Sequence, residues 1–151
     1  SEKSTIARKK KEIQYKSNLS ELPIYQKAID ILVLSRNIST YISQDLSYLR
    51  HDGSEDSDIY FSGDIIQQSE SLAPEIEKAQ AELCSYKKHK HLDALERLTH
   101  RLHLNCNRLQ HCNSNGKYYL PILQHELKTF KVTSQLYDDF VNYLSLVTFT
   151  T

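Results

Sequence analysis

Four stretches of the chain place apolar residues alternately three and four positions apart, and this spacing most constrains the fold. The stretches span residues 24–42, 65–83, 95–112 and 123–144. Such spacing lines one face of an α-helix with apolar side chains, which can then pack against another helix. Glycine and proline occur three times each, too seldom for the frequent turns of a β-sandwich or barrel. The sequence therefore predicts an all-α protein.

We call the apolar residues of each stretch a stripe. Short connections between the stripes favour an antiparallel up-down four-helix bundle over residues 22–147. A basic extension, helical or disordered, is expected before it over residues 1–21, and a frayed or extended tail after it over residues 148–151. Residues 51–58 contain no apolar side chain and are expected to form a loop. The boundary between the second and third helices is placed near residues 87–90.

Prolines and glycines suggest where the helices begin and end. Pro23 and Pro121 suit first helical turns, where a missing N–H costs nothing, and Ser20 is a candidate cap. The second stripe continues in phase across Pro74, which favours one kinked helix over two separate helices. Gly116 is expected to end the third helix in the left-handed conformation.

Each apolar stripe is interrupted once by a small or polar residue. These residues are Ser35, Ser69, Asn105 and Ser134. They are expected either to form a polar layer inside the bundle or to face a second subunit.

The chain is neutral overall, with 19 basic and 19 acidic residues, but the charges are segregated. Residues 1–22 and 86–117 are basic, whereas residues 44–82 carry ten acidic and two basic side chains. A basic segment attracts phosphate or acidic protein. The alternative is that the charged segments are solvated faces that pair with each other between helices or subunits.

If the protein binds nucleic acid, the basic segments are the candidate surface. Leucines at 95, 98, 102 and 109 are predicted to point inward, leaving the charged residues of this helix outside. The candidate binding residues are Lys87, Lys88, Lys90, Arg97, His100, Arg101, His103 and Arg108, together with Arg8, Lys9, Lys10 and Lys11 of the N-terminal segment.

Metal and cofactor sites have little support in the sequence. His100, His103 and Cys106 follow each other at intervals of three, which suits zinc ligands on a helix. However, the two histidines are predicted to lie on the outer side and Cys106 on the flank, so a tetrahedral site would need ligands from another subunit. No glycine-rich phosphate loop and no nucleophile–base arrangement is present. We therefore expect no metal, no cofactor and no catalysis.

Arg97 and His103 are separated by five residues, which resembles the Arg-x(4–6)-His signature of HEPN ribonucleases. Those enzymes are also small all-α proteins. The resemblance implies that this pair acts on an RNA phosphodiester, usually across a dimer. This chain departs from the family pattern because Leu98, rather than a polar residue, follows the arginine.

The cysteine count and the apolar runs suggest a location. The chain has three cysteines and no Cys-x-x-Cys, so a disulfide framework is not expected and a reducing cytoplasm is favoured. The longest unbroken apolar run is residues 31–34, which excludes a membrane span.

Two short segments resemble a bacterial four-helix-bundle family. That family includes the accessory variability determinant of diversity-generating retroelements and proteins encoded within intervening sequences of ribosomal RNA genes. Residues 22–32, with Tyr25-Gln26-Lys27-Ala28, resemble the start of its first helix, and residues 91–102 are similar to its third. The similarity covers roughly residues 22–145.

The resemblance implies a non-catalytic bundle that assembles into a ring, typically a pentamer. It further implies binding of a reverse transcriptase and its RNA through a positively charged surface. This chain departs from the strongly basic members, because it is neutral and its second helix is acidic. We expect a homo-oligomeric adaptor for a reverse transcriptase, RNA or both. The alternatives are a HEPN-like ribonuclease and a purely structural or regulatory oligomer.

Overall fold

The computed structural model describes residues 2–6, 19–48 and 50–150, with side chains up to residue 147. Within these ranges the chain forms helices and connecting loops and no strand. The labelled elements are α2 (Pro23–Asp45), α3 (Asp58–Glu70), α4 (Leu72–Ala81), α5 (Ser85–Leu109), the 3₁₀ helix η1 (Asn115–Tyr119) and α6 (Leu120–Thr150). The prediction of an all-α protein is confirmed.

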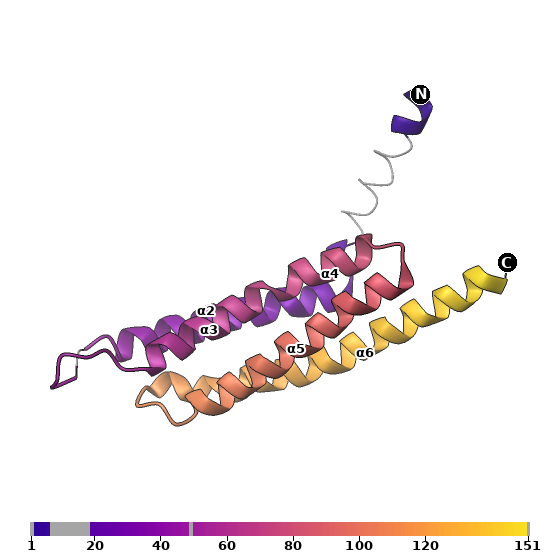
Figure 1. The fold of residues 1–151 in the computed structure, drawn as a ribbon. Coiled ribbons are helices and arrows are strands. Elements are labelled where there is room, and N and C mark those ends of the chain that lie inside the picture. Colours follow the sequence, from indigo (N-terminus) through magenta and orange to yellow (C-terminus); the bar gives the residue numbers. More distant parts are fainter. Residues whose placement is uncertain (1, 7–18, 49, 151) are drawn as a thin grey trace.

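The long helices lie side by side along one axis (Figure 1). α2 packs against α3 and α6, and α5 packs against α3, α4 and α6. The α2–α3 loop and the α5–α6 connection lie at one end, and the α4–α5 connection lies at the other (Figure 1). The last turns of α6 extend beyond that second end. In the described part of the chain, every helix is too short or too polar to cross a bilayer.

The core lies where the predicted stripes meet. Ile24, Ile65, Leu95 and Leu123, one from each stripe, are at most 1% exposed. Phe130 of α6 is the largest of the fully buried side chains. Most positions of the stripes therefore face the core, although Leu144, at the end of the fourth stripe, is 45% exposed. Leu19 also joins this core, so the packed part of the chain begins before residue 22.

Pro74 separates two helices, so the expectation of one kinked helix is wrong. α3 ends at Glu70 and α4 begins at Leu72. Pro74 has no N–H to donate to the Glu70 carbonyl, so the helical hydrogen-bond ladder is interrupted there. Ser71 nevertheless keeps helical angles, with φ −82° and ψ −14°. The chain therefore continues in nearly the same direction and the apolar phase is kept.

Two other predicted boundaries are wrong. Leu22, not Ser20, is the N-cap residue of α2, and its side chain makes no capping bond. α4 ends at Ala81 and α5 begins at Ser85, earlier than the expected boundary near residues 87–90. Leu83, expected within the second stripe, therefore lies in the connection and is 99% exposed.

The C-terminal tail is also helical where a frayed or extended end was expected. α6 continues to Thr150. β-branched residues lower helix propensity only slightly, by tenths of a kcal/mol each, so they do not end a long helix by themselves.

Gly116 has a packing role, not the expected left-handed one. Among the described glycines only Gly53, in the predicted loop, has a positive φ, of 82°. Gly116 lies in η1, where an added Cβ would be 2.7 Å from Ile42 Cγ1. The absence of a side chain lets the α5–α6 connection approach α2. Nearby, Asp45 Oδ2 accepts hydrogen bonds from Ser114 Oγ at 2.8 Å and from the Asn115 N–H at 3.2 Å.

The polar interruptions of the stripes have different surroundings. Ser35 and Ser69 are buried, and their hydroxyl oxygens lie 2.6 Å apart between α2 and α3. Asn105 Nδ2 donates to Gln68 Oε1 at 3.0 Å, from a half-buried position. Ser134 lines a groove described below. The expected polar layer is therefore limited to contacts with α3.

Candidate nucleic-acid interface

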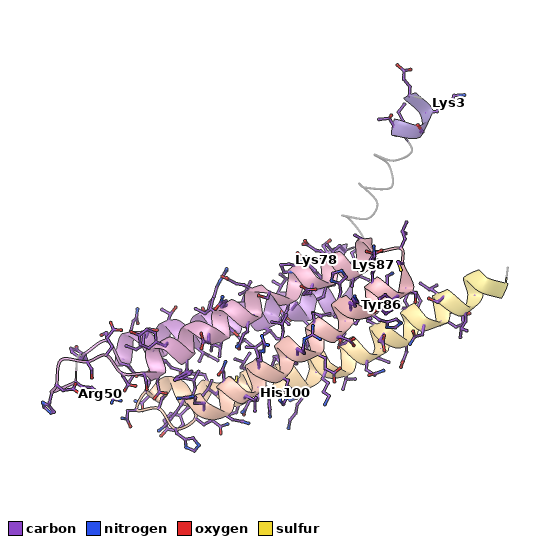
Figure 2. The ribbon with its side chains drawn as sticks, viewed as in Figure 1. Lys3, Arg50, Lys78, Tyr86, Lys87 and His100 are labelled. Carbon is purple, nitrogen blue, oxygen red and sulfur yellow. The ribbon has the colours of Figure 1, made fainter. Side chains whose placement is uncertain are left out.

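α5 presents the predicted basic residues to solvent. Its inward face is apolar, with Leu92, Leu95, Leu102, Cys106 and Leu109 buried. The exposed candidates are Lys87, Lys90, Arg97, His100, Arg101 and Arg108, while Lys88 and His103 are half-buried. Figure 2 shows Tyr86, Lys87 and His100 along α5. Arg8, Lys9, Lys10 and Lys11 lie outside the described residues.

The arginines form one side of this surface, and Arg108 lies against α3. Arg101 and Arg108 are seven residues apart and so lie along one line of the helix. The Arg108 guanidinium carbon lies 3.4 Å from the centroid of the Phe61 ring on α3. This cation–π contact holds the guanidinium in place while leaving its N–H groups at the surface.

The histidines form the other side, next to α6. His100 and His103 line a groove of about 440 Å³ between α5 and α6, to which α6 contributes Lys128 and Lys131. Leu92 and Leu127, which are almost fully buried, also line it. We call this site the α5–α6 groove.

The α5–α6 groove has opposite charges in its two halves. His89 Nδ1 lies 3.3 Å from Asp138 Oδ1, and Gln110 Nε2 donates to Gln124 Oε1 at 3.0 Å. These two contacts show that α5 and α6 run antiparallel to each other. The cationic half, defined as His100, His103, Lys128 and Lys131, therefore lies nearer the α5–α6 connection. The acidic half contains Asp93, Glu96 and Asp138 together with His89.

Within the part of the chain that the structure describes, few of the basic groups of α5 form ion pairs. His91 Nδ1 lies 2.9 Å from Glu75 Oε2 of α4, and His89 pairs with Asp138 as above. Across the described residues, no ion pair involves Lys87, Lys88, Lys90, Arg97 or Arg101. Among the described residues, the ion pairs between α5 and neighbouring helices are made by His89 and His91, and Arg108 interacts electrostatically with Asp58 of α3.

The structure separates the two residues of the ribonuclease-like pair. His103 lines the α5–α6 groove, whereas Arg97 does not. Five intervening residues place them about 120° apart around the helix. Within one chain, the arginine and the imidazole therefore do not face a common substrate position.

Cys106 is buried, which corrects its expected position on the flank. It is fully enclosed, and burial raises the pKa of its thiol to about 12. A thiol that stays protonated is a poor metal ligand and a poor nucleophile. Across the described residues, no three His, Cys, Asp or Glu side chains are placed to hold a metal ion.

Sequence reasoning missed the contribution of α6. Lys128 and Lys131 are three apart and so share a face of that helix, but nothing in the sequence relates this face to His100 and His103. The missed residues also include the carboxylates of the acidic half. Tyr86 was also missed; it is exposed, and the Lys90 ammonium lies 4.8 Å from its ring centroid.

Comparison with known proteins found no matching protein family, no matching curated protein and no matching solved structure. The function is therefore argued from the charges and contacts of the site itself.

Proposed function

We propose that the protein is a non-catalytic adaptor that binds RNA through the solvent face of α5. The observation that supports this most directly is the set of exposed cations on one helix that lack ion pairs within the described residues. Lysine and arginine give sequence-independent attraction to phosphate. Tyr86 adds an aromatic ring on which a base can stack beside Lys90.

The proposed architecture and setting follow the sequence expectations. We infer that α3 and α4 together act as one member of an antiparallel up-down four-helix bundle, because they continue one apolar stripe. The free cysteines Cys84, Cys106 and Cys112 support a reducing compartment such as the cytoplasm. A reverse transcriptase remains the proposed protein partner, on the resemblance alone.

Charge reversal on α5 tests RNA binding. Arg97→Glu with Arg101→Glu should weaken binding of a labelled single-stranded RNA by more than about tenfold at low salt. It should also flatten the dependence of log K on log salt, by about 0.7 for each phosphate that the variant no longer neutralises. Fluorescence anisotropy at several salt concentrations measures both.

The control changes net charge equally on another surface. Arg36→Glu with Lys78→Glu alters exposed cations of α2 and α4 and should leave RNA affinity within about twofold of wild type. Equal binding by wild type and the α5 variant would exclude this surface. Equal loss in both variants would show that overall charge, not α5, controls the affinity.

Self-association is proposed because α6 exposes apolar side chains. Val132, Leu136, Phe140 and Tyr143 are each more than half exposed. A pentamer is the proposed number, on the resemblance alone. The purely structural oligomer remains the second candidate, and it predicts assembly without any affinity for RNA.

The ribonuclease alternative has a simple test. If labelled RNA is cleaved by the protein and cleavage is lost in His103→Ala, the protein is an enzyme and the adaptor proposal is wrong. The position of Arg97 outside the α5–α6 groove argues against this within one chain.

A further inference from the structure

The cationic half of the α5–α6 groove combines donors from two helices around one space. His100 and His103 come from α5, and Lys128 and Lys131 come from α6. Each pair is spaced three apart, so both members of a pair lie on the same face of their helix. Neighbouring Thr99 donates its hydroxyl hydrogen to the Leu95 carbonyl at 2.7 Å, and His103 Nε2 lies 3.5 Å from Asn107 Nδ2. A phosphate here would therefore meet the two ammonium groups, the His100 imidazole and the other ring nitrogen of His103.

We infer that this half of the groove binds one phosphate group of the RNA that crosses α5, and that protonation of its histidines strengthens this binding. We call this phosphate-binding site the seat. The inference rests on the proposed function for the source of the phosphate. Phosphate oxygens accept hydrogen bonds only, which suits a site built from ammonium and imidazolium donors.

The charge of the groove explains why protonation should matter. When the histidines are neutral, the groove contains the positive charges of two lysines and the negative charges of three carboxylates, Asp93, Glu96 and Asp138. Protonation of His89, His100 and His103 adds three positive charges and makes the groove net positive. Among the described residues, the groove is lined by α5 and α6 alone.

The acidic half restricts where the strand can lie. Carboxylates repel phosphate, so a strand entering the groove is confined to the end near residues 100–103. His100 belongs both to this end and to the exposed face of α5. The seat is therefore continuous with the surface proposed for the rest of the strand, which favours an RNA phosphate over a free anion.

Two groove variants and one matched control test the seat. His100→Gln with His103→Gln removes the titrating groups, and Lys128→Gln with Lys131→Gln removes the permanent charges. His111→Gln with His125→Gln changes two histidines that do not line the groove. RNA affinity is measured by anisotropy at about pH 5.5 and pH 8, which bracket the ordinary histidine pKa.

Wild type and the His111/His125 control should bind RNA about tenfold more tightly at the lower pH. The His100/His103 variant should lose most of this gain, and the Lys128/Lys131 variant should bind more weakly at both pH values. If both groove variants behave as wild type while Arg97→Glu with Arg101→Glu loses RNA, the seat is wrong and the proposed function stands.

Inorganic phosphate separates the remaining outcomes. Its titration should shift the His100 and His103 imidazole signals in NMR spectra at the lower pH, and Lys128→Gln with Lys131→Gln should abolish the shift. If wild type binds phosphate here but no RNA, the proposed function fails and the seat serves a free phosphate-bearing molecule. Absence of any shift, together with unaltered RNA binding in the groove variants, would overturn the inference.

Discussion

Cys84 and Cys106 illustrate how burial controls reactivity at the scale of single residues. Cys84 is exposed in the connection before α5, whereas Cys106 and Cys112 are buried. Thiols react as thiolates, so both enclosure and a raised pKa protect the buried pair. For the buried pair, desolvation raises the pKa in each case.

Thiol labelling should therefore distinguish the three cysteines. In the native protein near pH 8, one equivalent of thiol, that of Cys84, should react rapidly with a disulfide reagent such as DTNB, and Cys84→Ser should abolish the rapid phase. All three should react after denaturation. A second rapid equivalent in the native state would show that the end of α5 opens readily.

The pKa of Cys106 also predicts a loss of stability in alkali. Its folded value is about 12, against an ordinary value of 9.0, because burial disfavours the thiolate. The contribution is fully present below about pH 9 and is lost as the pH rises from there toward 12, because only the unfolded chain ionises readily. The free energy of unfolding, measured in urea, should fall less steeply over this range in Cys106→Ala than in wild type.

At the scale of elements, two glycines on different helices should respond oppositely to substitution. Gly63 lies within α3, and a Cβ there would meet nothing within 4 Å. Gly63→Ala should stabilise the protein by about 0.5–1 kcal/mol, because alanine loses less conformational entropy in a helix. Gly116→Ala should destabilise it by about 1–3 kcal/mol, since its Cβ would overlap Ile42. Urea denaturation of both variants measures the difference; stabilisation by both would show that η1 moves freely away from α2.

The elements were largely predictable because apolar periodicity depends only on local spacing. Ile24, Ile65 and Leu95 are buried as their stripes require. The ends of the elements were not predictable, because they depend on contacts with neighbouring elements. Gly116 is explained by its approach to α2, and Ser71 keeps helical angles although Pro74 interrupts the hydrogen bonds. Neither the approach of Gly116 to α2 nor the helical angles of Ser71 can be predicted from the local spacing of apolar residues.

The candidate site was only partly predictable, by the same measure. The exposed face of α5 followed from the leucines opposite it. The α5–α6 groove did not, because it depends on how far α6 is rotated about its own axis toward α5. Lys128 and His100 meet there only through packing in three dimensions.

At the scale of the whole molecule, α6 presents an apolar surface on the outside. Light scattering of the wild type should give a mass above that of one chain, and this mass should persist at high salt, because salt screens charges but not apolar contacts. Leu136→Glu with Phe140→Glu should reduce it to one chain. Leu104→Glu, at an exposed leucine of α5, should not. A mass that falls with salt in the wild type would instead favour assembly held by the charged segments.

Asp45 has a consequence for the order of events during synthesis. Its bond to Ser114 joins residues 69 positions apart. While a ribosome is still making α3, α4 and α5, the Ser114 hydroxyl that donates a hydrogen bond to the Asp45 carboxylate does not yet exist. The end of the molecule that contains the α5–α6 connection can therefore be completed only after residue 114 has been made. Nascent chains that end before residue 114 should remain sensitive to proteases at that end of the molecule.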